Sequence, residues 1–334
     1  MSESGDYNPG VWAGHDFASA RKTYDAHAGR SYDAAVTSGK ATTDLIAKNV
    51  KTNSTAPVII VVDETGSMGD WPATIFSKLP YLENEGKEYL GEDFEICFMA
   101  VGDAYNNEDY PLQVRQFAKG IDLKDRIKEL VIEGKGGGTK SETYELAALF
   151  ANEKVEIPNA IKPIIIFIGD EKCYDTISPD HAKALLDITL EKTLTTKAVF
   201  KKLQDKYSVY LIRKSYGTSS GNTMSSDDIT ITNDWAKLIG EDHISNLPEA
   251  GRVVDVIFGI LAKETGRIAY FENELEDRQL TDKDGKHKVD VVYKSLATIH
   301  KIPEHVRSVS GKSVLRNSKK DKNDKTSKKV EPLI

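Results

Sequence analysis

Short, wholly apolar runs alternate along this chain with segments whose apolar residues recur at the spacing of an α-helix. A wholly apolar run of about 4 to 8 residues is typical of a strand that is buried on both faces. Strands are expected at residues 57–62, 94–101, 112–117, 163–169 and 207–213. Helices are expected at residues 73–90, 123–132, 142–152, 179–186 and 199–206, and residues 251–265 and 268–271 complete the series.

This alternation predicts an α/β fold with a doubly wound, mostly parallel sheet flanked by helices, formed by residues 56–275. Residues 1–55 lack a sustained apolar period, so they are interpreted as an N-terminal arm with a candidate helix at 42–50. Pro80 is expected to kink or break the helix that contains it, because proline lacks an N–H donor. The Gly-, Ser- and Thr-rich residues 215–226 predict a mobile loop.

The charge of the chain is divided unevenly along its length. The whole chain carries a formal charge of −7, but residues 301–334 hold ten Lys or Arg against four Asp or Glu, which leaves −13 for the rest. An acidic body argues against nucleic-acid binding by the fold itself, although the basic tail can attract phosphates. Residues 276–334 are therefore interpreted as a C-terminal extension whose tail, from about residue 305, is expected to be disordered.

Composition and cysteine use indicate a globular protein of the cytoplasm. The chain is 334 residues long and 39% hydrophobic, which is enough for one sizeable core, and its longest apolar runs are far too short to span a membrane. The first residues lack the basic and apolar regions of a secretory signal. Cys97 and Cys173 lie in or beside apolar runs, so both are expected to be packed, reduced thiols.

Two of the expected strands end in an acidic residue, and this pattern carries the candidate chemistry. Asp63 follows the run at 57–62, and Asp170 follows the run at 163–169. Carboxyl ends of parallel strands meet at one edge of a sheet, where ligands bind. Thr65 and Ser67 alternate after Asp63 in a loop whose tight turn Gly66 permits, so one carboxylate and two hydroxyls can face the same point. Such oxygen ligands suit Mg²⁺.

The stretch Asp63-Glu64-Thr65-Gly66-Ser67 resembles the metal-ion-dependent adhesion site of von Willebrand factor A domains, of the intracellular type found in bacteria and phage. The family's usual pattern is Asp-x-Ser-x-Ser, and threonine at the middle position keeps the hydroxyl. The resemblance, which covers about residues 56–275, implies further ligands on two later loops. Thr139 and Asp170 stand at suitable places for them. Glu142 and Thr143 are alternatives to Thr139 as the middle ligand.

The resemblance implies a non-enzymatic, metal-dependent module that binds or scaffolds proteins. Its cation would be Mg²⁺, Mn²⁺ or Ca²⁺, and a partner's Asp or Glu would complete the coordination. Intracellular proteins that resemble this chain in this way often work in large assemblies or beside AAA+ ATPases. The arm and the tail are candidate contact segments.

Three other interpretations of these residues stay open. The first is a helix-capping turn made by Ser67 or Asp70. The second is a haloacid-dehalogenase-like phosphotransferase with Asp63 as nucleophile, although Thr65 stands where such a loop has a second acid, Glu64 stands where some have a lysine, and residues 169–172 fit the later loop poorly. The third is a phosphate cradle in the glycine-rich residues 134–139, which lack the ending of a P-loop.

Overall fold

The computed structural model of the chain describes residues 46–69, 71–106, 110–120, 122–123, 126, 130, 139–216, 224–281 and 283–299. The chain divides into two units, Met1–Ile299 and His300–Ile334, and all described residues belong to the first. Five sequence predictions lie wholly or mainly outside the described residues: the arm up to residue 45, the helix at 123–132, the glycine-rich phosphate cradle at 134–139, the centre of the loop at 215–226, and the basic tail.

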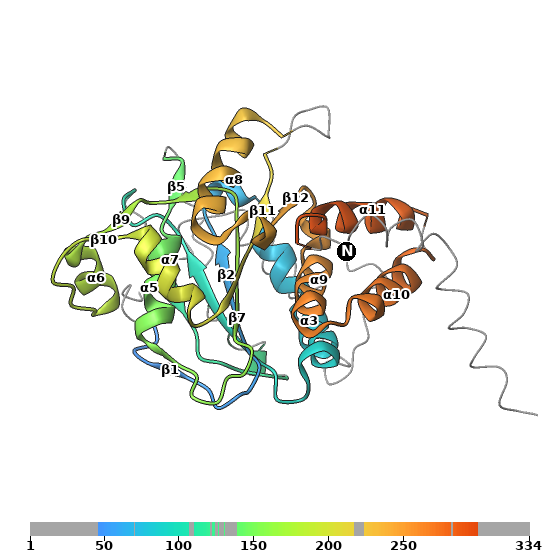
Figure 1. The fold of residues 1–334 in the computed structure, drawn as a ribbon, viewed down its shortest axis with the longest axis horizontal. Coiled ribbons are helices and arrows are strands. Elements are labelled where there is room, and N and C mark those ends of the chain that lie inside the picture. Colours follow the sequence, from blue (N-terminus) through green and yellow to red (C-terminus); the bar gives the residue numbers. More distant parts are fainter. Residues whose placement is uncertain are drawn as a thin grey trace, which may run out of the picture. The chain divides into compact units, whose positions relative to one another are not determined.

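A six-stranded sheet forms the centre of the described fold, in the order β12-β11-β7-β2-β3-β4 (Figure 1). Neighbouring strands from β12 to β3 run parallel, and β4 pairs antiparallel with β3 at the edge. The strands are β2 (Pro57–Asp63), β3 (Glu95–Val101), β4 (Leu112–Val114), β7 (Ile164–Gly169), β11 (Ser208–Lys214) and β12 (Ile244–Leu247). The prediction of a mixed α/β fold with a mostly parallel sheet flanked by helices is confirmed.

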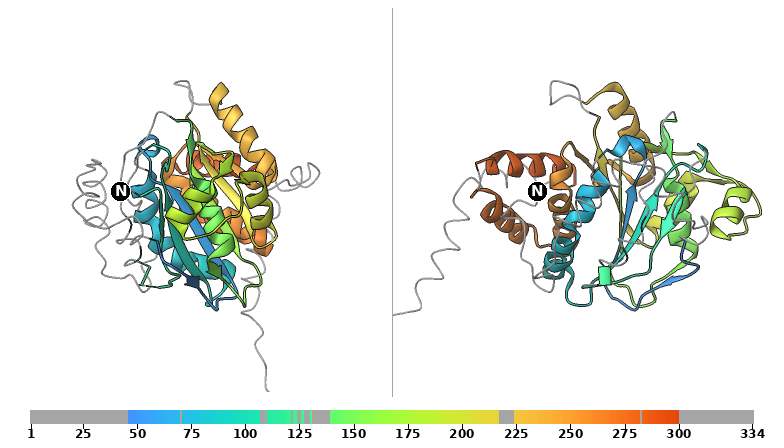
Figure 2. Two further views of the ribbon diagram at one scale, coloured as in Figure 1. Left: turned by 90° about the vertical axis from the view of Figure 1, so that its left-hand side faces the viewer. Right: turned by 180° about the vertical axis from the view of Figure 1, so that it is seen from behind.

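Alternate side chains of β2 enter two separate hydrophobic cores, one on each face of the sheet. Val58, Ile60 and Val62 pack into a core shared with α3, α9, α10 and α11, and Ile59 and Val61 pack into a core shared with α5, α6, α7 and α8. Figures 1 and 2 show these helices on opposite sides of the sheet. Because both faces are covered, the central strands are apolar throughout rather than alternating.

The helices on the first face are α3 (Trp71–Leu90), α9 (Val253–Thr265), α10 (Ile268–Gln279) and α11 (Gly285–Leu296). Those on the second face are α5 (Tyr144–Glu153), α6 (Pro179–Leu186), α7 (Thr196–Gln204) and α8 (Ser226–Ile239). Short 3-10 turns are η3 (Gly66–Met68), η4 (Glu241–His243) and η5 (Ala250–Arg252).

Three pairs of two-residue strands lie outside the central sheet. They are β1 (Val50–Lys51) with β6 (Val155–Glu156), β5 (Ser141–Glu142) with β8 (Lys172–Cys173), and β9 (Thr176–Ile177) with β10 (Leu194–Thr195). The first two pairs are parallel and the third is antiparallel. Because β8 begins two residues after Asp170, the β5–β8 pair places Ser141 and Glu142 beside the segment that follows β7.

Several sequence predictions are wrong in detail. The described end of the expected helix at 42–50 is not helical, because Val50 pairs with Val155 in β1 and β6. The helix α3 continues through Pro80 to Leu90, so proline does not break it there. This fits the long contact of α3 with α9, since packing on the core stabilises a helix that lacks one backbone hydrogen bond.

Other elements differ in their ends or were not predicted. The strand expected at 112–117 stops at Val114, and Glu142 lies in β5 rather than in the following helix. The helices α8 and α11 and the strand β12 were missed. In α8 the buried residues Ile231, Trp235 and Ile239 recur at helical spacing, but the polar residues between them hide the pattern.

Two further observations bear on the sequence predictions. Both cysteines are free and buried, as expected for packed thiols. Within the described ranges, none of the helices combines the length and the apolar character that crossing a membrane demands.

Candidate metal centre

Pairing of β2 with β7 places the ends of these two strands side by side. Val62 stands opposite Ile168 in the parallel register, so Asp63 and the Gly169-Asp170 step leave the sheet at the same edge. Both aspartates are fully buried. The structure therefore brings together the two acids whose strands were predicted to meet.

The loop after Asp63 folds back on that residue's carboxylate. The backbone N–H of Thr65 donates to Oδ1 of Asp63 at 2.8 Å, and the Thr65 hydroxyl donates to the same oxygen at 2.6 Å. The 3-10 turn η3 follows, with the N–H of Met68 donating to the carbonyl of Thr65. The left-handed backbone conformation falls at Gly69, with φ of 66°, rather than at Gly66 as the sequence suggested.

A row of oxygen atoms joins the two aspartates through the loop hydroxyls. The hydroxyls of Thr65 and Ser67 are 3.1 Å apart, and the Ser67 hydroxyl donates to Oδ1 of Asp170 at 3.0 Å. We call Asp63, Thr65, Ser67 and Asp170 the oxygen row. The hydroxyl of Ser67 thus engages Asp170, and Asp70, the other candidate helix cap, lies outside the described residues.

The oxygen row is continuous in hydrogen bonds. The Thr65 hydroxyl donates to Asp63 and the Ser67 hydroxyl donates to Asp170, and either hydroxyl can donate across the 3.1 Å that separates them. Hydroxyl and carboxylate oxygens grouped in this way are ligands that suit a hard cation.

Burial makes the negative charge of the oxygen row costly. Burial raises the pKa of Asp63 to about 7, and the nearby charge of Asp170 adds to this shift. Burial also raises the pKa of Asp170, an effect that the ammonium of Lys214 and the hydroxyl of Ser67 partly oppose. A buried carboxylate is stable only when positive charge or hydrogen-bond donors compensate it. Burial therefore favours the protonated form of these acids unless further positive charge is brought to the oxygen row.

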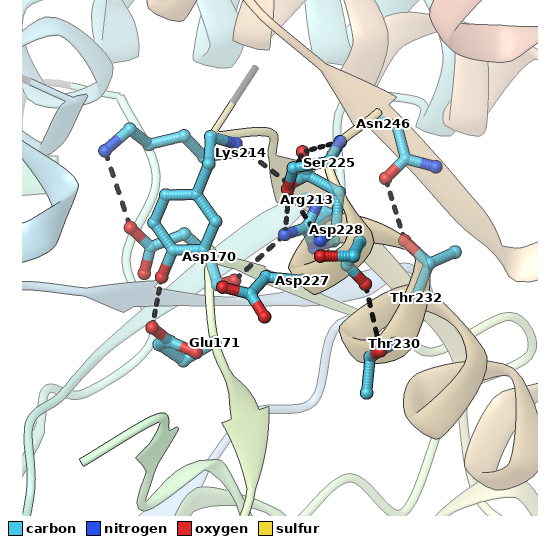
Figure 3. A network of polar contacts seen from close by, with 12 residues as sticks. Asp170, Glu171, Arg213, Lys214, Ser225, Asp227, Asp228, Thr230, Thr232 and Asn246 are labelled. Carbon is cyan, nitrogen blue, oxygen red and sulfur yellow. Dashed lines mark hydrogen bonds and ion pairs between the residues drawn. The ribbon is translucent and has the colours of Figure 1, made fainter. Parts of the chain in front are cut away.

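Two donors to the oxygen row were not found in the sequence. The Tyr144 hydroxyl donates to Oδ2 of Asp63 at 2.5 Å, and Lys214 Nζ lies 3.4 Å from Oδ2 of Asp170 (Figure 3). Lys214 is the last residue of β11, which pairs with β7, so the rule that located Asp170 also points to it. Tyr144 begins α5 and has no comparable signal in the sequence.

The residues proposed for the middle loop lie in different surroundings. The Thr139 hydroxyl donates to Oδ2 of Asp103 at 2.7 Å, and the Thr143 hydroxyl donates to the carbonyl of Gly102. Glu142 is buried in β5. The hydrogen bonds of Thr139 and Thr143 therefore lead to the loop after β3 rather than to the oxygen row.

Asp103 is a further buried acid at this edge that the sequence argument missed. It follows β3, and its Oδ1 accepts from the Tyr174 hydroxyl at 2.8 Å and from the N–H of Tyr105 at 2.9 Å. The signal was present in the sequence, because Gly102 and Asp103 directly follow the apolar strand that ends at Val101, so a third apolar strand is followed by an acid. Asp103 with Thr139 forms a second acid-and-hydroxyl pair beside the oxygen row's strands.

Arg213 and Asp228 form a fully buried ion pair behind the oxygen row. Their side chains are 2.6 Å apart, and Arg213 also reaches the carbonyl of Asp170 at 3.4 Å (Figure 3). Burial acts to raise the pKa of Asp228, but N–H donors from Tyr216 and Ser225, together with Arg213, outweigh it and hold the pKa at about 2. Asp228 also caps α8 through Ser225. The pair fixes the end of β11 against α8.

The donor set is rich in hydroxyls and poor in the ligands of transition metals. Across the parts of the chain that the structure describes, no group of three or more His, Cys, Asp or Glu side chains is placed to hold a metal ion. A cation in the oxygen row would therefore have to use hydroxyl oxygens beside two carboxylates. Such a set suits a hard divalent cation that retains water ligands.

Comparisons with known proteins do not assign a family. No family model matches the chain, and no curated protein matches it. Among solved structures, the pilus adhesin SpaC from Lactobacillus rhamnosus GG in its open conformation is 10% identical, with a TM-score of 0.44, and the match covers 67% of this chain and 31% of that one.

Proximal thread matrix protein 1 from the mussel byssus is also 10% identical, with a TM-score of 0.40 and coverage of 65% and 48%. The chain spans less than half of either protein, and likenesses this weak do not decide its function.

Proposed function

We propose that the chain is a metal-dependent protein-binding module of the von Willebrand factor A type. Asp63, Thr65, Ser67 and Asp170 would hold a divalent cation, and an Asp or Glu of a protein partner would complete its coordination. The observation that carries the proposal is the continuous row of side-chain oxygens that runs from Asp63 through Thr65 and Ser67 to Asp170, in which the two hydroxyl oxygens lie 3.1 Å apart.

The residues present fit a hard cation of the Mg²⁺, Mn²⁺ or Ca²⁺ kind. Two acidic groups and two hydroxyls form a continuous row, and a bound cation would stabilise the ionised form of the acids, which burial disfavours. Bound there, such a cation would supply a Lewis-acidic position for an oxygen ligand of the partner. Thr65 and Ser67 would contribute hydroxyl oxygens, and the Tyr144 hydroxyl fixes the Asp63 carboxyl group through a hydrogen bond.

Binding rather than catalysis is favoured by the residues around Asp63. A phosphotransferase loop of the haloacid-dehalogenase kind carries a second acid two residues after its nucleophile, and Thr65 stands at that position. The Thr65 hydroxyl instead donates to Oδ1 of Asp63. The haloacid-dehalogenase alternative is therefore less well supported.

The finer features of the fold fit the same proposal. Parallel strands with helices on both faces, and acids at the carboxyl edge, support a doubly wound arrangement of the von Willebrand factor A kind. Thr139 would belong to the site only through Asp103, and Glu142 stays an alternative middle ligand. We place the module in the cytoplasm, in keeping with its two free thiols, within a large assembly or beside an AAA+ ATPase.

Calorimetric titration of the full chain with Mn²⁺ and Mg²⁺ tests the metal. We expect one binding site for a divalent cation. Its affinity should fall at least about tenfold in Ser67→Ala, because the Ser67 hydroxyl contacts both Thr65 and Asp170 and so joins the two halves of the oxygen row. Asp63→Ala should abolish binding. Asp227→Asn is the matched control, because Asp227 is an exposed acid paired with Lys140. The proposal is contradicted if the wild-type protein binds none of Mn²⁺, Mg²⁺ and Ca²⁺. It is also contradicted if all variants bind the metal with the same affinity.

Two further measurements separate binding from catalysis. When the chain is used as bait in a pull-down from the native source, the bound proteins should be released by a chelator and should bind again when Mn²⁺ is added. The Ser67→Ala variant should not capture them. A set of bound proteins that does not respond to the chelator would remove the metal from the explanation. Release of phosphate from a generic aryl phosphate with Mg²⁺ that depends on Asp63 would favour the enzyme instead.

A further inference from the structure

Lys214 places an ammonium group directly on the oxygen row. Its Nζ donates to the backbone carbonyl of Ser67 and lies 3.4 Å from Oδ2 of Asp170. The two residues it contacts come from different strand ends, so the ammonium bridges the loop after β2 and the loop after β7.

The contacts of Asp170 show that Lys214 uses an oxygen that a metal site would also need. Oδ1 of Asp170 accepts from Ser67, and Oδ2 faces Lys214. Both carboxylate oxygens are thus engaged within the protein.

The neighbouring Arg213 contacts Asp170 in a different way. Arg213 is paired with Asp228 at 2.6 Å and reaches Asp170 at its backbone carbonyl. Lys214 is therefore the cation that stands directly against the Asp170 carboxylate, at 3.4 Å.

Lys214 is the member of this pair that has access to solvent. Its side chain is 19% exposed, whereas that of Asp170 is fully buried. A lysine stem is flexible, and an ammonium that turns outward regains its hydration. Displacement of the pair by a metal would therefore move Lys214 rather than Asp170.

We infer that Lys214 is a built-in competitor of the divalent cation, which holds Asp170 in place when no metal is bound and weakens metal binding by charge repulsion. This inference rests on the proposed function, because it concerns the same oxygen row. It identifies Lys214 as the residue that sets the metal affinity of the module. A purely structural role would instead make Lys214 a fixed ion-pair partner whose loss leaves metal affinity unchanged or weaker.

The test is calorimetric titration of Mn²⁺ into the full chain carrying Lys214→Met, Lys214→Arg or Lys237→Met. Methionine keeps most of the stem and removes the charge, so Lys214→Met should bind at least about tenfold more tightly, because the metal no longer has to displace an ammonium from Asp170 or be repelled by it. Lys214→Arg keeps the charge and should stay within about threefold of wild type. Lys237→Met removes an exposed lysine of α8, paired with Asp234, and should not change the affinity.

Thermal unfolding supplies a second readout that does not depend on a partner. With chelator present, Lys214→Met should melt at a lower temperature than wild type, because Asp170 loses its counter-charge. Mn²⁺ should raise the melting temperature of Lys214→Met more than that of wild type.

The outcomes distinguish this inference from the proposed function. If wild type and Lys214→Met both fail to bind Mn²⁺, the metal site itself is refuted and the inference falls with it. If wild type binds Mn²⁺ and Lys214→Met binds it equally or more weakly, the metal site stands and competition by Lys214 is refuted.

Discussion

The hydroxyl of Tyr144 donates a hydrogen bond to Oδ2 of Asp63 at 2.5 Å, across 81 residues of sequence. The ring of Tyr144 packs edge-on against Trp235, with centroids 5.3 Å apart, so its position is set by the hydrophobic core. Burial, with the charges of Asp63 and Asp170, raises the pKa of Tyr144, which keeps the hydroxyl protonated as a donor. The orientation of the first acid of the oxygen row is therefore determined by packing behind the sheet.

Removing this hydroxyl should destabilise the protein. We expect Tyr144→Phe to lower the free energy of unfolding by about 1 to 3 kcal/mol, because a buried carboxylate loses a donor while the ring packing is kept. Urea unfolding followed by circular dichroism measures the change. Tyr293→Phe is the control: its hydroxyl donates to Glu276 at 3.1 Å in a half-buried position and should cost less than about 1 kcal/mol. Equal losses in the two variants would show that Asp63 does not depend on Tyr144.

Gly169 leaves the space that Tyr144 occupies. A methyl group on Gly169 would lie 1.9 Å from the Tyr144 hydroxyl oxygen and 2.7 Å from its ring carbon Cζ. Because Tyr144 is fully buried and cannot turn aside, Gly169→Ala should lower the free energy of unfolding by roughly 1 to 3 kcal/mol.

The control for this substitution is Gly251→Ala, where an added methyl group meets nothing within 4 Å. Its free energy of unfolding should stay within about 0.5 kcal/mol of wild type in the same urea experiment. Wild-type stability in Gly169→Ala would mean that Tyr144 is not confined as described.

The buried pair of Arg213 and Asp228 should make stability depend on pH in the acid range. The pKa of Asp228 in the folded protein, about 2, lies below its ordinary value of 3.8, so the ionised form is the one that stabilises the fold. Its contribution is full above about pH 4 and is lost as the pH falls toward 2. The difference in unfolding free energy between wild type and Asp228→Asn should therefore be roughly 2 to 3 kcal/mol near pH 6 and shrink below about pH 4.

Urea unfolding at several pH values between about 6 and 3 measures this difference. Asp227→Asn, one residue away on the same helix but exposed, should match wild type throughout this range. A difference for Asp228→Asn that stays constant with pH would contradict the assignment of its titration.

Both thiols should resist modification in the folded protein. Cys97 and Cys173 are buried, so a reagent cannot reach their sulfur atoms. Burial also raises the pKa of each thiol, so the reactive thiolate form is scarce. We expect no reaction with Ellman's reagent in native buffer and reaction of two thiols per chain in guanidinium. Lys237→Cys, at an exposed position, should react at once and serves as the positive control. Rapid reaction of Cys97 or Cys173 in native buffer would show that the packing around that cysteine opens readily.

The sequence alone predicted the main strands and the place of the acids. Residues 57–62 and 163–169 are apolar throughout, and only strands covered on both faces bury every side chain in this way. From this, the meeting of Asp63 and Asp170 followed, because parallel neighbours end at the same edge. The elements that were missed or shortened are those with mixed polarity, such as α8 and β4, whose partners lie far away in the chain.

The identity of the oxygen row was thus determined by local sequence, since Asp63, Thr65 and Ser67 lie within one turn and Asp170 follows the next strand of the sheet. Only the tertiary structure decided which donors surround it. Tyr144, Lys214 and the bond from Thr139 to Asp103 depend on which loops become neighbours and on how buried polar groups compete for a limited number of partners. Hydrophobic periodicity is a local property of the chain, but the compensation of a buried charge is not.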